Sequence, residues 1–156
     1  MPPQSLEVRR YRNEDRFEVK LLQRVVGCDP PLLPGESEEI PAGGAWVGQL
    51  RLHLVRAAAP VAWGPVVALA IARPLPDSVA EIVRICVHPA HRRRGYARTL
   101  VTTLEECSRA SGLRCLLLSL PAPSGCASTE ALGRSLGYRF EPGGASGSGC
   151  HLKCLH

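Results

Sequence analysis

The segment 81–112 constrains the fold of this chain most, because a short basic turn there joins a strand pattern to a helix pattern. Residues 81–87 are rich in β-branched side chains, and Pro89 ends the run. Three arginines and Gly95 follow, and apolar residues then recur at helical spacing until Ser111-Gly112. This order of strand, tight turn and amphipathic helix predicts a chain that mixes α and β elements around a sheet.

The helix predicted after Gly95 has two unlike faces. One face carries Ala97, Leu100, Val101, Leu104, Cys107 and Ser108, and the other carries Arg98, Thr102, Glu105, Glu106 and Arg109. We expect the first face to pack on the sheet and the second to face water.

The turn before this helix has the features of an anion site. The first backbone N–H groups of a helix have no partner within it, and the helix dipole is positive at that end. Gly95 leaves room for a ligand, while Arg92 and Arg94 supply forked donors. The turn therefore predicts a phosphate or pyrophosphate ligand. The alternative is a solvated basic turn that only caps the helix.

The rest of the chain alternates strand and helix patterns. We expect strands within 6–11, 46–55, 66–72, 114–120, 138–140 and 151–155, helices within 13–26 and 129–136, a long loop at 28–44 and a Gly/Ser turn at 143–149. For 46–55 a helix is the alternative, because Leu, Arg and Ala all favour one. The length of 156 residues predicts one domain, 1–156, and the order β–α–β–β–β–α–β–α–β–β predicts a mixed sheet.

Two local signals refine these expectations. Asn13 precedes two acidic residues, as a helix cap does, and Phe17, Leu21, Leu22 and Val25 follow at helical spacing. Further along, prolines at 74 and 76 are expected to end the strand that begins near residue 66.

Composition is that of an ordinary globular protein. Hydrophobic residues make up 45% of the 156 and charged residues 21%, and no apolar run approaches the ~20 residues of a membrane helix. The start of the chain lacks the pattern of a secretion signal. We therefore expect a cytoplasmic protein with no membrane partner, the nucleus being the alternative compartment.

The cysteines number seven, and an odd count without a secretion signal favours reduced thiols. Cys86, Cys107 and Cys115 fall in apolar stretches, where cysteine usually acts as a small buried hydrophobe. Cys150, His151, Cys154 and His156 cluster near the end of the chain, but their spacing matches no standard zinc site. We interpret that cluster as an ordinary last strand and expect no metal.

The basic turn resembles motif A of the GNAT superfamily of N-acetyltransferases, whose loop reads Q/R-x-x-G-x-G/A. Arg92, Gly95 and Ala97 fill its three positions. Val87-His88-Pro89 is similar to the Val-x-Pro that often precedes the loop, and Leu136-Gly137-Tyr138 is similar to the family's Leu-Gly-Phe. The resemblance implies an α/β (α+β) fold with a mixed, mostly antiparallel sheet of six to seven strands, flanked by helices and splayed between strands four and five.

It also implies acetyl-coenzyme A as co-substrate. In the family, the pantetheine arm lies in the gap between the splayed strands, and the pyrophosphate sits on the N–H groups of the loop. The implied cofactor-binding residues are Ile85, Cys86, Val87, Arg92, Arg93, Arg94, Gly95, Tyr96, Ala97 and Arg98. Among them, Ile85 and Val87 would pair their backbone groups with the pantetheine amides.

A base must take the proton of the acceptor amine. Glu81 is the first candidate, because Glu81-Ile82-Val83 followed by Gly95-Tyr96 resembles the histone acetyltransferase branch, where a glutamate at this position is the base. The alternative is a solvated residue at the start of a strand. His88 and His53 are weaker candidates.

The departing thiolate needs an acid, and here the sequence differs from the family. Many members place a tyrosine four residues before the glycine of Leu-Gly-Phe, where this chain has Gly133. Ser124, Cys126, Ser128 or water would then donate the proton. The alternatives are that the last helix lies a few residues from its expected place, or that the protein binds acetyl-coenzyme A and acylates slowly or not at all. An asparagine frequent near Cys126 in the family is also absent.

Three functions follow. The first is an acetyl-coenzyme A-dependent N-acetyltransferase that acts by direct transfer to an amine, with a slight preference for a protein or peptide amine. The second is a catalytically weak coenzyme A-binding sensor or scaffold. The third is a nucleic-acid binder, which the net charge of +5 favours and an aromatic content of 4% disfavours. A homodimer is an open alternative, because dimers are common in the family.

Overall fold

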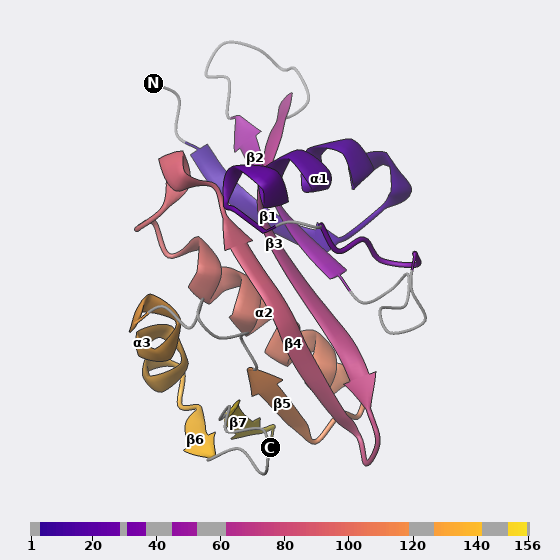
Figure 1. Cartoon of the computed structure of the whole chain (residues 1–156), viewed down its shortest axis with the longest axis vertical. Helices are drawn as coiled ribbons and strands as arrows, with labels where there is room; N and C mark the ends of the chain where they lie inside the picture. Colours follow the sequence, from indigo (N-terminus) through magenta and orange to yellow (C-terminus); the bar gives the residue numbers. More distant parts are fainter. Residues whose placement is uncertain are drawn as a thin grey trace.

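The fold is a seven-stranded sheet with helices on both faces (Figure 1). The structure is a computed structural model that describes residues 4–28, 31–36, 45–52, 62–118, 127–141 and 150–155. The strands lie in the order β1-β2-β3-β4-β5-β7-β6, in which β4 and β5 are parallel and all other neighbours are antiparallel. The predicted fold class is confirmed.

The elements follow the expected order along the chain. They are β1 (Gln4–Arg10), the 3-10 helix η1 (Asn13–Asp15), α1 (Arg16–Val25), β2 (Ala45–Leu52), β3 (Ala62–Leu75), β4 (Val79–Val87), the 3-10 helix η2 (Pro89–His91), α2 (Tyr96–Ala110), β5 (Cys115–Leu118), α3 (Ala127–Ser135), β6 (Arg139–Glu141) and β7 (Cys150–Cys154). Residues 53–61, 119–126, 142–149 and most of the 28–44 loop lie outside the described residues, so the expectations for them stay predictions.

Two apolar clusters hold the layers together, one on each face of the sheet. Strand β3 contributes to both, because its alternate side chains point to opposite faces. Its alanines at 68, 70 and 72 pack with Leu100, Val101 and Leu104 of α2, whereas Leu69 and Ile71 pack with Val19 and Leu22 of α1. The alanines leave room for α2 to lie close to the strands.

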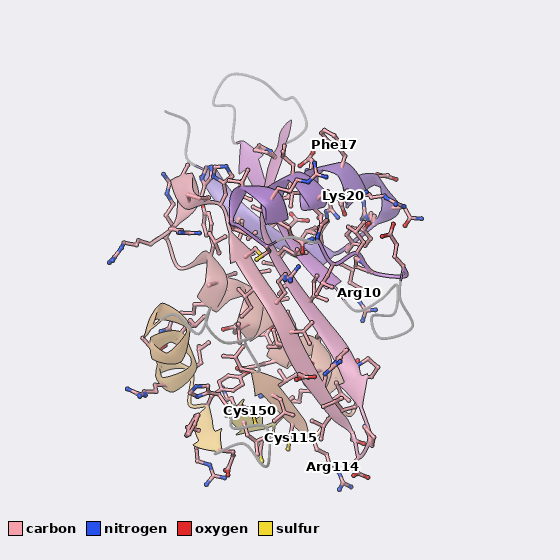
Figure 2. All side chains as sticks on the ribbon, viewed as in Figure 1. Arg10, Phe17, Lys20, Arg114, Cys115 and Cys150 are labelled. Atoms are coloured by element: carbon pink, nitrogen blue, oxygen red, sulfur yellow. The ribbon has the colours of Figure 1, made fainter. Side chains whose placement is uncertain are left out.

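The buried face of α1 differs from the predicted one. Val19, Leu22 and Gln23 are buried, whereas Phe17, Leu21 and Val25 are 76%, 52% and 48% exposed. Phe17 accordingly lies on the outer side of α1 in Figure 2. The helix carries two apolar stripes, and periodicity alone does not say which of them meets the sheet.

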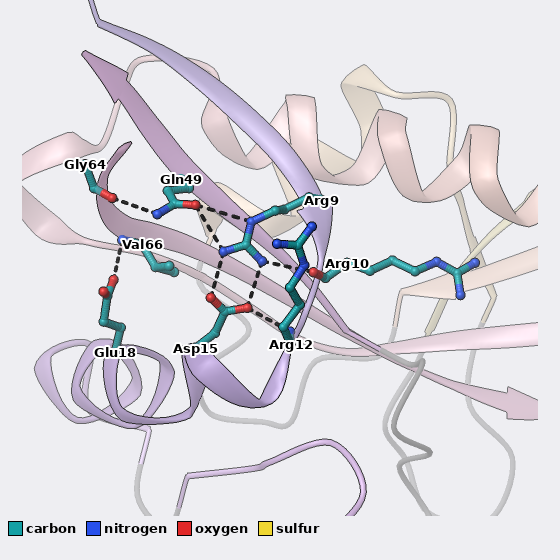
Figure 3. A network of polar contacts seen from close by, with 8 residues as sticks. All are labelled: Arg9, Arg10, Arg12, Asp15, Glu18, Gln49, Gly64 and Val66. Atoms are coloured by element: carbon teal, nitrogen blue, oxygen red, sulfur yellow. Dashed lines mark hydrogen bonds and ion pairs between the residues drawn. The ribbon is translucent and has the colours of Figure 1, made fainter. Parts of the chain in front are cut away.

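A polar network fixes this orientation of α1 (Figure 3). The guanidinium of Arg9 donates to both carboxylate oxygens of Asp15, at 2.8 and 2.7 Å, and the Arg12 N–H donates to Asp15 at 2.7 Å. The Val66 N–H donates to Glu18 of α1 at 2.7 Å. The expected cap is therefore corrected: Asp15 takes the capping role, and Asn13 begins the 3-10 helix.

Two further expectations were wrong. Pro74 does not end β3, which continues to Leu75, because proline is tolerated near the end of a strand that pairs for only a few more residues. Glu105 does not face water; it is 6% exposed, and its Oε2 accepts a 2.9 Å bond from Lys153 Nζ of β7. Across the described ranges, no helix is both long and apolar enough to span a bilayer.

Candidate functional site

Strand β4 loses one neighbour halfway along its length. It pairs with β5 only over Val79–Ile82, opposite Cys115–Leu118, whereas its pairing with β3 continues to Val87. Among the residues that the structure describes, none pairs with the β5-side edge of β4 beyond Ile82. This is the splay that the family resemblance implies.

The register shows which backbone groups face this open edge. The His88 N–H donates to the Val67 carbonyl of β3 at 2.8 Å, and successive residues of a strand direct their polar groups to opposite sides. Cys86 therefore directs its N–H and C=O toward β3, and Ile85 and Val87 direct theirs toward the gap. A bulge at Val83 precedes them, since Ile71 pairs with Arg84 and Ala72 with Ile82.

Cys86 is thus set apart from the two residues beside it. Its side chain is 3% exposed and packs in the cluster under α1. Its backbone faces β3. The structure brings Ile85 and Val87, but not Cys86, to the open edge.

A tight turn carries the chain from β4 to α2. Arg92 folds back so that its Nε donates to the Val87 carbonyl at 3.2 Å. Arg93 and Gly95 have φ of 61° and 78°, in the left-handed region that favours glycine. An arginine in this conformation is uncommon for a non-glycine residue, and it turns the loop so that α2 begins directly after Gly95.

The start of α2 presents free backbone N–H groups at the turn where the sequence predicts an anion site. Its first hydrogen bond runs from the Thr99 N–H to the Gly95 carbonyl at 3.0 Å, so the N–H groups of Tyr96, Ala97 and Arg98 have no partner within the helix. A Cβ built on Gly95 meets no atom of the described ranges within 4 Å. Arg92, Arg93 and Arg94 are exposed around this space.

Arg98 has a second partner. Its Nη2 donates to Ser135 Oγ of α3 at 2.7 Å, and this bond links the start of α2 to the end of α3. The side chain is exposed, so it stays accessible beside the anion site.

Glu81 lies in the paired part of β4, before the gap opens. Its carboxylate is 13% exposed and accepts a 2.5 Å bond from Arg73 Nε, the residue facing it on β3. Arg73 was not identified from the sequence. The sequence signal was that Arg73 is a charged residue near the end of an otherwise apolar strand. The sequence does not show that its partner is Glu81, because this pairing depends on the register of β3 and β4.

A second polar group missed in the sequence lies between α1 and β4. Gln23 is fully buried, and its Oε1 accepts from Arg84 Nη1 at 2.7 Å and from the Leu32 N–H at 3.0 Å. This pairing holds the segment after α1 against the sheet.

A cavity of about 230 Å³ lies at one edge of α1. It is lined by Glu18, Leu21, Leu22, Val25, Pro65, Val66, Val67, His88 and His91. Burial, together with the charges of Arg94 and His88, lowers the pKa of His91, which keeps its ring neutral near pH 7. The Nδ1 atom of His88 accepts a hydrogen bond from the Ala90 N–H at 3.1 Å, so this side chain caps the start of η2.

Gly133 lies where α3 packs closely on the sheet. A Cβ at this position would be 3.4 Å from Leu118 of β5 and 3.7 Å from the ring of His151 of β7. The imidazole of His151 fills the neighbouring space, and its buried Nδ1 has no hydrogen-bond partner among the residues that the structure describes. The other donor candidates, Ser124 and Cys126, lie outside the described residues, and the side chain of Ser128 is not described. His53 and His156 are also outside them.

The sequence of residues 21–138 matches the family model described as the acetyltransferase (GNAT) family. This range contains the β4 edge, the basic turn and α2. A search of curated protein sequences gives no match.

Solved structures share the fold at low identity. The ribosomal-protein-S18-alanine N-acetyltransferase from Escherichia coli is 17% identical, with a TM-score of 0.64 over 97% of this chain and 94% of that one. The PaiA N-acetyltransferase from Thermoplasma acidophilum, in complex with coenzyme A, is 12% identical, with a TM-score of 0.65 over 96% and 99%.

A larger enzyme contains the same fold as a part. The N-acetylglutamate synthase from Neisseria gonorrhoeae, complexed with coenzyme A and N-acetyl-glutamate, is 15% identical, with a TM-score of 0.69 over 97% of this chain and 35% of that one. Identities this low establish the fold and leave the acceptor open.

Proposed function

Because this chain belongs to the acetyltransferase (GNAT) family, we propose that it transfers an acetyl group from acetyl-coenzyme A directly to a primary amine, and that the acceptor is a protein or peptide amine. The observation that carries the proposal is the junction of two features. The open edge of β4 at Ile85 and Val87 leads directly into the anion site at the start of α2.

The residues at this junction fit coenzyme A. The N–H groups of Tyr96, Ala97 and Arg98 would hold the pyrophosphate, and the empty space at Gly95 admits it. Arg92, Arg93 and Arg94 would add charge-assisted bonds to the phosphates. The backbone groups of Ile85 and Val87 would pair with the pantetheine amides. When bound, acetyl-coenzyme A supplies the acetyl thioester.

We assign the base to Glu81. Its carboxylate would accept the proton of the acceptor amine, directly or through one water. The bond from Arg73 holds the carboxylate in one orientation at the end of β4 where the gap closes. The acceptor class is supported by the similarity around Glu81 to the histone acetyltransferase branch and by the Escherichia coli relative, whose name gives a protein alanine as its substrate.

We assign the proton donor to His151. Its ring lies beside Gly133, and its buried Nδ1 meets no hydrogen-bond partner within the described part of the chain. His151 pairs with Leu118, and Leu118 pairs with Ile82, so the ring belongs to the row of residues at which β4 and β5 part. From this point His151 would donate the proton that the departing thiolate needs.

A second function is favoured by one pairing. Arg73 Nε already donates to Glu81 Oε2, so one of the two carboxylate oxygens is engaged before an amine arrives. A coenzyme A-binding sensor with little turnover would use the same anion site without this step. A panel of peptide and small amines, incubated with acetyl-coenzyme A and analysed by mass spectrometry, separates the two: an acceptor gains one acetyl group only if the chain is an enzyme.

The cofactor assignment is tested by Gly95→Ala, with Gly112→Ala as its matched control. The two glycines flank α2, have φ of 78° and 82°, and leave open space at the Cβ position. Each alanine should cost about 1 kcal/mol in folding stability, because alanine is strained in the left-handed region. Only Gly95→Ala places a methyl group in the anion site, so only this variant should lose affinity for acetyl-coenzyme A, by about tenfold or more, in titration calorimetry.

Equal affinities of the two folded variants would exclude the pyrophosphate from this turn. If the protein then bound nucleic acid with a steep salt dependence, the third function, a nucleic-acid binder that uses the basic turn, would be favoured.

A further inference from the structure

Two cysteines from different strands lie in contact at the end of the sheet far from α1. The Sγ atoms of Cys115 on β5 and Cys154 on β7 are 3.5 Å apart. Cys154 is exposed and Cys115 is half-buried, so solvent reaches the pair. Figure 2 shows Cys115 at the lower end of the molecule, opposite the end where α1 lies. The expectation that Cys115 is a buried hydrophobe is therefore wrong.

Strand geometry makes this contact more than a chance approach. Cys115 and Cys154 are direct partners in the antiparallel register of β5 and β7. The Leu155 N–H donates to the Arg114 carbonyl at 2.6 Å, so the hydrogen bond joins the residues that flank the pair. The two cysteines thus occupy a non-hydrogen-bonded position, where Cα atoms are about 4.5 Å apart and side chains are closest. A disulfide requires Cα atoms about 4.4–6.8 Å apart.

We propose that Cys115 and Cys154 form a modification site, a dithiol that a low-molecular-weight disulfide such as glutathione disulfide oxidises to a disulfide between β5 and β7. The proposal is independent of the acetyl-transfer assignment, because it uses no residue of that site.

The reaction is a pair of thiol–disulfide exchanges. Cys154, the exposed partner, loses its proton to water, and its thiolate attacks one sulfur of glutathione disulfide, forming a mixed disulfide and releasing one glutathione thiolate. Cys115 then loses its proton, and its thiolate attacks Cys154 Sγ and releases the second glutathione. Two protein thiols are oxidised by two electrons, and one glutathione disulfide becomes two glutathione molecules.

The contact also favours Cys154 as the first nucleophile. The Cys115 thiol donates its hydrogen to Cys154 Sγ, and this bond, with burial and the nearby Cys154 sulfur, raises the pKa of Cys115. Cys154 is also the more exposed of the two thiols, so glutathione disulfide reaches it first.

A second pair of cysteines provides an internal comparison. Cys28 and Cys86 have Sγ atoms 3.9 Å apart, but Cys86 is 3% exposed, and burial, with the neighbouring Cys28, raises its pKa to about 12. A buried thiol that stays protonated reacts slowly. Glutathione disulfide should therefore oxidise Cys115 and Cys154 before it oxidises Cys28 and Cys86.

The test is to incubate the intact protein with glutathione disulfide and map its peptides without reduction. The expected product is a cross-linked peptide that joins Cys115 to Cys154 and is two hydrogens lighter than the sum of the two peptides. The thermal midpoint should rise on the order of 5–15 °C and return with dithiothreitol, because the bond closes a loop between positions 39 apart.

Cys154→Ser should abolish the cross-link, whereas Cys150→Ser, on the same strand, should leave it unchanged. A product that stops at glutathione on Cys154, or a cross-link that joins Cys28 to Cys86 first, would overturn the proposal.

Discussion

The pairing of β3 with β4 decides which side chain contacts Glu81, and that side chain is Arg73. The two residues face each other across the β3–β4 ladder, so the guanidinium meets the carboxylate without a bend in either backbone. Because the Glu81 side chain is only 13% exposed, the bond from Arg73 fixes the carboxylate more firmly than a bond to a fully exposed carboxylate would. The candidate base therefore has a defined position before any substrate arrives.

Glu81→Gln should reduce turnover by about 10²-fold, since an amide cannot take a proton from the amine. The loss should be largest at low pH, where more of the acceptor amine is protonated and depends on the base. Steady-state rates across pH, with acetyl-coenzyme A affinity measured alongside, check this expectation.

Glu106→Gln is the matched control, because it removes the same charge from an exposed position on α2. A pH–rate profile of Glu81→Gln that coincides with that of the control would remove Glu81 from the base role.

The position of α1 on the sheet depends on the carboxylate of Asp15. Burial by itself raises the pKa of Asp15, but the hydrogen bonds from Arg9 and from the Arg12 N–H, with the charges of both arginines, outweigh it and hold the pKa below its ordinary value of 3.8. A carboxylate whose pKa is lowered on folding stabilises the fold above its unfolded-state pKa. That contribution is lost as the pH falls through the lower, folded-state value.

Asp15→Asn should lower the free energy of unfolding by about 3 kcal/mol at neutral pH, because it leaves a largely buried arginine without its anion. Denaturant titrations at pH 7 and at pH 3 measure this loss, which should be smaller at the lower pH. Glu14→Gln, at the exposed neighbouring position, should change stability by less than about 0.5 kcal/mol. Equal losses in both variants would show that the ion pair does not anchor α1.

Two glycines set the spacing between elements, and replacing each with alanine should have opposite effects. At Gly133, a methyl group meets nothing closer than 3.4 Å, so Gly133→Ala should stabilise α3 by about 0.5–1 kcal/mol. At Gly48, a methyl group would be 3.0 Å from both Ala68 Cβ and Leu6 Cδ1, so Gly48→Ala should destabilise the sheet by about 1–3 kcal/mol. Thermal melts of both variants check the two signs.

At the scale of the whole molecule, the sheet is continuous over β1–β4 and parts from β5 beyond Ile82. The two apolar clusters lie on opposite faces of β3 and β4, so both faces of these central strands are fixed by packing. A ligand that enters the gap would meet backbone groups held rigidly in place, which limits the entropy lost on binding.

Acetyl-coenzyme A should therefore raise the thermal midpoint of the whole protein. At a hundredfold excess over the dissociation constant, binding adds about 2.7 kcal/mol, which for a chain of this size is a rise on the order of 5–10 °C. ATP, which shares only the nucleotide part, should give a smaller rise. No shift with saturating acetyl-coenzyme A would contradict the proposed function at its first step.

Short-range sequence patterns predicted the order of the helices and strands and the position of the basic turn. The element order, the amphipathic α2 and the basic turn depend on residues close together in the chain, where propensity, helix periodicity and glycine conformation act directly. Arg92, Gly95 and Ala97 identified the turn, and α2 begins directly after Gly95 as expected; the anion site there stays a prediction.

Only the tertiary structure decided the contacts between residues far apart. The side of α1 that meets the sheet, the burial of Glu105, the pairing of Glu81 with Arg73, and the meeting of Cys115 with Cys154 all depend on strand register and helix rotation. Both are set by the cooperative packing of the two clusters, and shifting a strand by a single residue would turn its side chains to the opposite face. Local patterns specify which elements form; long-range packing specifies which side chains meet.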